Sequence, residues 1–163
     1  TMEHITAVLG HLQDLHAATP IAKLAAFFHD AVYEPTRSDN EAQSAELARE
    51  VLRAVDRPEA DDVAAIVLAT AKHELPLNGP RETAAFLDAD LAILAARPDV
   101  YDAYTVNVRA EYSHVAEDDF RNGRRAILEG FLQRDQLFFT TIGQARFEVA
   151  ARANLRREIT SLS

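Results

Sequence analysis

His29 and Asp30 are adjacent in this chain, and a histidine beside an aspartate can contribute two ligands to a divalent metal. The pair lies in an apolar segment, residues 24–33, through which no polar face can be drawn at helical or strand spacing. Such a segment is predicted to be buried, where ionisable groups are costly unless they are paired or metal-bound. The pair therefore requires partners from elsewhere in the chain.

A further carboxylate is predicted to face inward from the helix expected between residues 81 and 96. On a helical projection Asp90 falls inside the apolar arc, whereas Asp88 lies nearly opposite, where it can be solvated or can bond a neighbouring helix. The arc is formed by Phe86, Leu87, Leu91, Ile93 and Leu94. Helical phase favours Asp90 as the buried carboxylate, and a kink or a shift of one residue would make it Asp88.

Three histidines lie on or beside other apolar faces. His4 and His11 share one face of the helix expected over residues 2–17, and His73 lies at the margin of an apolar face near residue 74. The predicted inward-facing set is His4 or His11, His29, Asp30, Asp90 and His73. Two imidazoles and two carboxylates suit a divalent ion such as Mn, Fe, Co, Ni or Zn, with Mg kept as a candidate. Water and substrate would take the remaining positions, which is typical of a hydrolytic site.

Helices are expected to position these residues, because Gly and Pro fall between segments of helical periodicity and no convincing alternating strand pattern occurs. The predicted fold is all-α, one domain over residues 1–163 with about eight helices. Ser38 and Glu41 have the spacing of a capping box. The first residues resemble the middle of a helix, so further chain before Thr1 is expected. The helices are expected over residues 2–17, 20–33, 38–55, 57–74, 81–96, 100–116, 118–134 and 144–161.

The bulk composition narrows the function. The chain has 163 residues, a formal net charge of −9 and no cysteine. An acidic chain argues against a nonspecific binder of nucleic-acid polymers or anionic membranes, although a small phosphorylated molecule could still bind a locally positive pocket. Without cysteine, a metal must be held by His, Asp or Glu. A cytoplasmic protein is expected, while the oligomeric state and the identity of the metal stay open.

The order of these residues resembles a known family. His4, then His29-Asp30, then Asp90 is similar to the H…HD…D signature of the HD superfamily of metal-dependent phosphohydrolases. Nearly the whole chain resembles a bacterial group of small stand-alone HD proteins that are described as predicted phosphohydrolases. The segments that carry this similarity are 28–33 (FHDAVY), 40–41 (NE), 44–45 (SA), 86–91 (FLDADL), 109–112 (RAEY), and Glu148, Ala151, Arg152 and Asn154.

The resemblance implies hydrolysis of a phosphate ester at a divalent metal held by His4, His29, Asp30 and Asp90. Asp30 is then expected to orient or deprotonate the attacking water. Glu41 is a candidate general acid or base, although the capping box would also explain it. His73 is a candidate to bind phosphate or a second metal, or to protonate the leaving oxygen; the alternative is a solvated histidine at a helix end.

Basic residues are candidates for contacts with a small phosphorylated substrate, a nucleotide being the best guess. Arginine and lysine complement phosphate charge, although most such residues on helices are simply solvated or paired. The candidates are Lys72, Arg109, Arg124 and Arg152. Other functions stay open: a dinuclear site acting on a pyrophosphate or a phosphodiester, a non-catalytic HD protein with a structural metal or a nucleotide-sensing role, and a helical interaction domain without metal.

Overall fold

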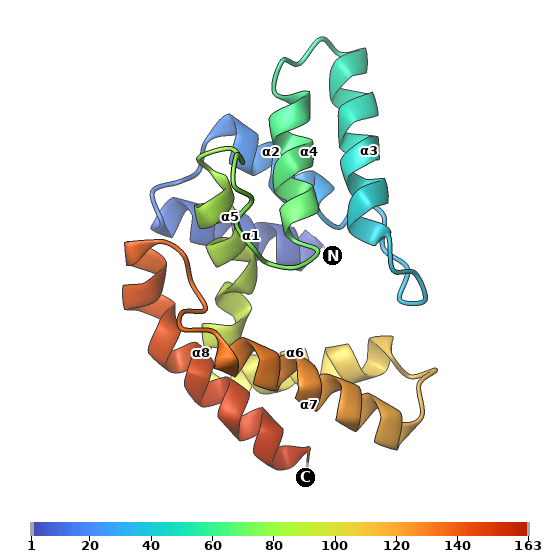
Figure 1. Ribbon diagram of the computed structural model, residues 1–163, viewed down its shortest axis with the longest axis vertical. Helices are drawn as coiled ribbons and strands as arrows, with labels where there is room; N and C mark the ends of the chain where they lie inside the picture. The colour runs from blue at the N-terminus through green and yellow to red at the C-terminus, as the bar shows by residue number, and fades with distance from the viewer. Residues whose placement is uncertain (1, 163) are drawn as a thin grey trace. The chain divides into compact units, whose positions relative to one another are not determined.

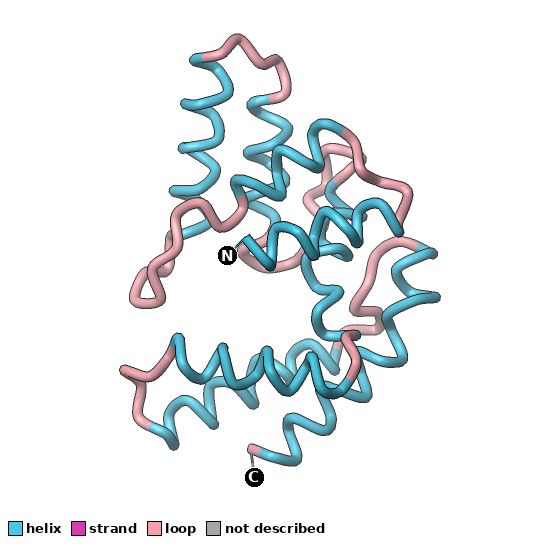
Figure 2. Tube along the Cα trace, turned by 180° about the vertical axis from the view of Figure 1, so that it is seen from behind, coloured by secondary structure: helices cyan, strands magenta, loops and turns pink. Residues whose placement is uncertain are grey.

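The computed structural model describes residues 2–162, and over these residues the protein is all-α, as predicted (Figure 1). No strand occurs in this described range (Figure 2). Thr1, before which further chain is expected, lies outside the described residues. The elements are α1 (Met2–Asp14), α2 (Pro20–Phe28), α3 (Asn40–Ala54), α4 (Ala60–Ala69), α5 (Thr83–Leu91), the 3-10 helix η1 (Ala92–Ala95), α6 (Pro98–Glu111), α7 (Glu117–Gln133) and α8 (Thr141–Ser161).

The chain divides into two compact units, Thr1–Asp90 and Leu91–Ser163. The prediction of a single domain over residues 1–163 stays a prediction. No helix among residues 2–162 is long and apolar enough to cross a membrane.

Small residues let the helices of the first unit approach closely. Helix α4 packs against α3 and α2, and α2 packs against α1. The buried faces of α2 and α3 are dominated by alanines, which bring neighbouring backbones together at little cost in side-chain entropy. The fully buried alanines are Ala22, Ala25, Ala26, Ala45 and Ala48, and the larger core side chains include Val8, Leu12, Val63, Ile66, Val67, Phe86 and Leu87.

Helix α2 begins as predicted but ends five residues early. The Thr19 side chain accepts a hydrogen bond from the Ala22 amide, and Pro20 occupies the first turn. The helix ends at Phe28, so the His-Asp pair lies in the turn that follows and not inside a helix reaching residue 33. The expected burial of the whole segment is also wrong, since Phe27 and Tyr33 are each about half exposed.

The predicted capping box is absent from the start of α3. Asp39 is the N-cap residue and makes no side-chain cap bond, which places Glu41 one position too early for the box. The Asp39 carboxylate instead binds Arg37, and the Asn40 side chain bonds the backbone of Glu34. The loop before the helix is thus held by contacts of Asp39 and Asn40, and not by the Ser38 and Glu41 side chains.

Helix α5 differs from the prediction in both its length and its burial. The α-helical part stops at Leu91, and the expected continuation to residue 96 is the tighter 3-10 helix η1. Thr83 and residues 85–89 are all buried, so the helix has almost no exposed face. Because the helix is buried on all sides, it has no polar face from which the core-facing side could be assigned in the sequence.

The second unit is held by buried polar groups as well as apolar ones. Its long helix α8 packs against η1 and α7, and η1 also packs against α6. The buried Asn154 amide donates to the carbonyls of Leu94 and Ala96, each at 2.9 Å, and so closes the end of η1. Glu158 accepts a hydrogen bond from Tyr101 and a two-pronged contact from Arg124.

Candidate metal centre

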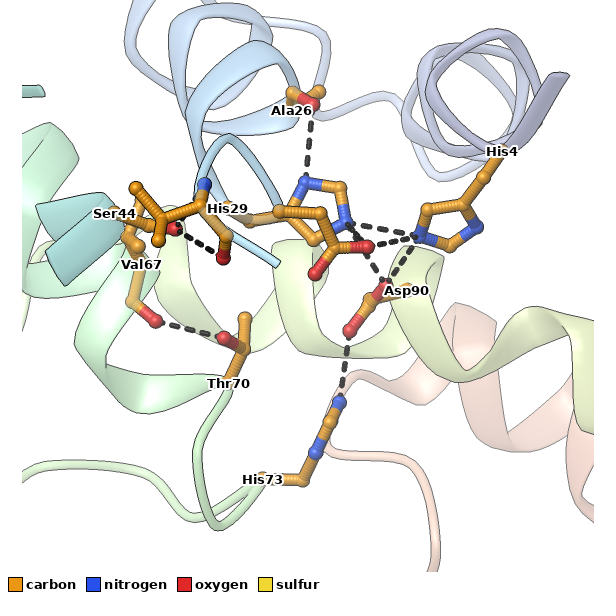
Figure 3. Close-up of polar contacts among 10 residues, drawn as sticks. His4, Ala26, His29, Ser44, Val67, Thr70, His73 and Asp90 are labelled. Atoms are coloured by element: carbon orange, nitrogen blue, oxygen red, sulfur yellow. Dashed lines mark hydrogen bonds and ion pairs between the residues drawn. The ribbon is translucent and has the colours of Figure 1, made fainter. Parts of the chain in front are cut away.

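Side chains from three separate elements converge at one point of the first unit (Figure 3). The Nε2 atoms of His4 on α1 and His29 after α2 lie 2.9 Å apart, and His4 Nε2 lies 3.1 Å from Oδ1 of Asp90 at the end of α5. Asp90 Oδ1 is 3.6 Å from His29 Nε2. These three ligand atoms form a single group that is able to hold a metal ion.

The spacing of these atoms suits ligands of a single ion. Two ligands about 2.1 Å from a metal lie about 3.0 Å apart in adjacent octahedral positions and about 3.4 Å apart in tetrahedral ones. The observed separations among His4, His29 and Asp90 run from 2.9 to 3.6 Å. Both the donor types and their separations therefore fit a divalent cation.

His29 is oriented by its own helix. Its ring is buried, and Nδ1 lies 3.0 Å from the carbonyl oxygen of Ala26 in the last turn of α2. A carbonyl only accepts hydrogen bonds, so Nδ1 carries the proton and Nε2 of the neutral ring keeps a lone pair. The end of α2 at Phe28 is what leaves the ring in reach of that carbonyl. His29 thus presents Nε2 in the form that metals bind.

The contacts of His4 indicate a hydrogen on its Nε2 atom. Since His29 Nε2 and Asp90 Oδ1 are both acceptors, the proton between them belongs to His4 Nε2. The hydrogen bond to Asp90 raises the pKa of His4, burial opposes the rise, and the charges of Asp90 and Asp30 add to it. A cation at this point would replace that proton.

Asp90 is a carboxylate fixed at both oxygens. While Oδ1 faces His4, Oδ2 lies 2.8 Å from Nε2 of His73, in the turn after α4. Burial alone would raise the pKa of Asp90, but the hydrogen bonds from His4 and His73 hold it well below its usual range. The carboxylate is therefore ionised and aimed into the cluster.

Asp30 is the most accessible member of the set. Its Oδ2 lies 3.4 Å from His29 Nε2 and 3.8 Å from His4 Nε2, with 43% of its side chain exposed. It stands at the open side of the cluster, next to the buried His29.

The structure brings Asp90 and His4 to the cluster rather than Asp88 and His11. The ligand group consists of His4, His29 and Asp90. Asp88 is fully buried, so the expectation that it can be solvated is wrong, because α5 has no solvent-facing side. Nevertheless, the alternative that helical phase favoured is the one whose carboxylate lies beside the histidines.

Ser44 is a supporting residue that the sequence analysis did not single out for a role. It is fully buried in α3, and its Oγ accepts from the Val32 amide at 3.0 Å and donates to the Val32 carbonyl at 3.2 Å. This contact fixes the turn just after His29-Asp30 (Figure 3). A serine in an otherwise alanine-lined helix face was the available signal.

The group of potential ligands found among the described residues does not include the other predicted site residues. Glu41 is half-buried in the first turn of α3, and Lys72 is exposed after α4. Arg109 binds Glu117 and the carbonyls of Tyr112 and Val115.

Arg124 and Arg152 likewise have partners within the second unit. Arg124 is paired with Glu158, and Arg152 binds Glu148 and the backbone carbonyls of residues 132, 134 and 135. These contacts account for three arginines within residues 91–163 without a substrate, and their role in phosphate binding stays a prediction.

Comparison with protein-family models, with curated proteins and with solved structures finds no match for this chain. The function must therefore be argued from the residues themselves.

Proposed function

We propose that this chain is a metal-dependent phosphohydrolase of the HD type that acts on a small phosphorylated molecule such as a nucleotide. The observation that supports the proposal is the convergence of two imidazole nitrogens and a carboxylate oxygen within 3.6 Å of one another, with a second carboxylate beside them. These four side chains come in the order of the H…HD…D signature. They are His4, His29, Asp30 and Asp90.

In this proposal the four side chains hold a divalent cation. A cation held there would supply the positive charge that acidifies a water and offsets the charge of a phosphoryl group. His29 and Asp90 provide rigid ligand atoms, because His29 is buried, Asp90 is mostly shielded, and each is fixed by a hydrogen bond on its far side. His4 completes the group and would have to give up its Nε2 proton to act as a ligand.

Asp30 is assigned the proton-transfer step. Its side chain is nearly half exposed, so a water can reach it, and its oxygen lies beside both histidines. The attacking water forms the new bond to phosphorus while its proton passes to an Asp30 oxygen, and the bond to the leaving oxygen breaks. A carboxylate in contact with solvent can then release that proton and return to its starting state.

The first experiment asks whether a metal binds. The protein is purified without added metal, its metal content is measured, and its melting temperature is followed as Mn²⁺, Co²⁺, Ni²⁺ or Zn²⁺ is added. A ligand at one hundred times its Kd stabilises a protein by about 2.7 kcal/mol, which is a shift of several degrees. Absence of bound metal together with absence of any shift would contradict the proposal and favour a helical interaction domain.

The second experiment asks whether the metal-bound protein is an enzyme. Wild type and Asp30→Ala are compared on a panel of nucleotides, a generic phosphomonoester and a generic phosphodiester. Hydrolysis is expected to fall at least 100-fold in Asp30→Ala, and Asp62→Ala, at an exposed aspartate on α4, is the matched control. Equal activity in wild type and Asp30→Ala would assign the hydrolysis to a contaminant. Metal binding without hydrolysis of any panel member would favour a structural or sensing role.

A further inference from the structure

His73 occupies an unusual backbone position. It lies in the turn that follows α4, with φ of 47°. Among residues 2–162, the non-glycine residues with positive φ are His16, Asp56 and His73. This left-handed conformation costs a residue with a Cβ about 1 kcal/mol or more, and it persists where the surroundings determine it.

The left-handed turn brings the His73 ring to the back of the Asp90 carboxylate. Thr70 ends α4 by donating its hydroxyl to the Val67 carbonyl at 2.7 Å, and three residues later the imidazole turns toward α5 (Figure 3). His73 Nε2 lies 2.8 Å from Asp90 Oδ2, the oxygen opposite the one that faces His4. The ring is mostly shielded from solvent, with 19% of the side chain exposed.

In the hydrogen bond between His73 and Asp90, the histidine is the donor. A carboxylate oxygen accepts and a ring N–H donates, so this hydrogen bond places the hydrogen on His73 Nε2. A nitrogen that donates in this way has no lone pair for a metal. His73 also stands behind Asp90 as seen from His4, since each contacts a different carboxylate oxygen. This places His73 on the side of the Asp90 carboxylate away from His4.

We propose that His73 is a positioning residue that fixes the plane of the Asp90 carboxylate and thereby aligns Oδ1 with the two histidine nitrogens. The inference rests on the proposed metal site, whose ligands it does not extend. Loss of a hydrogen-bond partner behind a metal ligand costs 10- to 100-fold in metal affinity. His73 then acts through Asp90 and makes no contact of its own with substrate.

The test separates the hydrogen bond from the strained backbone. His73→Leu removes the donor and keeps a Cβ, whereas His73→Gln places an amide nitrogen near the former Nε2. His16→Leu is the matched control, because His16 has φ of 54° but is exposed. Co²⁺ affinity is measured by titration, and the visible spectrum of bound Co²⁺ reports the ligand geometry.

We expect Co²⁺ affinity to fall 10- to 100-fold in His73→Leu, with a changed spectrum, to recover largely in His73→Gln, and to be unchanged in His16→Leu. Equal affinity and equal spectra in wild type and His73→Leu would overturn the inference while leaving the metal site in place. Equal loss in the leucine and glutamine variants would overturn it as well. No Co²⁺ binding by wild type would instead be a failure of the proposed function.

Discussion

His4 and His29 face each other through their Nε2 atoms, 2.9 Å apart, although 25 residues separate them in sequence. The Nδ1 proton of His29 is committed to the Ala26 carbonyl, so the proton between the two rings is carried by His4. The metal-free protein therefore holds a proton at the point where the proposed cation would bind. Protons and metal should compete there, and this competition gives the first prediction.

The stability of the metal-free protein should depend on the charge of His4. The hydrogen bond to Asp90 raises its folded-state pKa above the usual 6.5. The stabilisation that protonated His4 gives the folded protein is therefore fully present below about pH 6.5, and it is lost as the pH rises through the raised folded-state pKa. Urea unfolding of wild type and His4→Gln should show a larger difference in unfolding free energy at pH 6 than at pH 8. His16→Gln is the exposed control, and a difference that grows with pH would contradict the assignment.

Metal affinity should have the opposite pH dependence. Because a cation must displace the His4 proton, Co²⁺ affinity of wild type is expected to rise from pH 6 to pH 8, with proton release measurable by calorimetry in buffers of different ionisation enthalpy. In His4→Gln the affinity should be lower and its dependence on pH shallower. A pH-independent affinity in wild type would show that His4 is not a ligand.

Asp90 and Asp88 should separate metal binding from stability. Asp90→Asn is expected to abolish the metal-induced rise in melting temperature, because it removes the charge from a ligand atom. Asp88→Asn changes a fully buried side chain and should lower the melting temperature without removing the response to metal. The measurement is a thermal melt with and without Co²⁺. The reverse pattern would identify Asp88 as the ligand.

The buried ion pair of the second unit should matter for stability alone. Arg124 and Glu158 are both largely shielded; burial lowers the pKa of Arg124, but the hydrogen bond to Glu158 and the charge of that carboxylate raise it above its usual value. Glu158→Gln should cost about 3 to 5 kcal/mol of unfolding free energy, because it leaves a buried guanidinium without its counter-charge. Asp102→Asn, which breaks the exposed contact with Arg157, should cost less than about 1 kcal/mol. An equal cost in both variants would show that burial does not set the value of the pair.

Ser44 should couple the stability of α3 to the metal site. Ser44→Ala leaves the Val32 amide and carbonyl without their partner and should cost about 1 to 3 kcal/mol, with weaker Co²⁺ binding as the His29-Asp30 turn loosens. Ser38→Ala is the matched control. Its exposed hydroxyl forms no cap on α3, so a change within about 0.5 kcal/mol is expected. A large loss of unfolding free energy in Ser38→Ala would indicate that Ser38 caps α3 after all.

The sequence was informative where one helix face decides burial. Apolar periodicity and the placement of Gly and Pro were enough to predict an all-α chain, and Thr19-Pro20 marked the start of α2. The end of α2 was not predictable in the same way, because it depends on Ser44 in another helix and on a carbonyl that accepts from His29. Burial of Asp88 was missed because α5 is enclosed on all sides, a property of its neighbours and not of its own pattern.

The roles of the polar residues were harder to read than their positions. Arg124 and Arg152 looked like candidates for phosphate because arginine suits that ligand. Their actual partners, Glu158 and Glu148, can be weighed only once α7 and α8 are seen to pack. The position of His73 behind Asp90 depends on a left-handed backbone angle that no periodicity encodes.

His4 and Asp90 meet across 86 residues of chain, and the contact has a kinetic consequence. An ion bound there would be a removable crosslink between α1 and α5. A crosslink that forms only after both helices have packed should slow unfolding much more than it speeds refolding. Amide exchange in α1 would report whether this crosslink is formed.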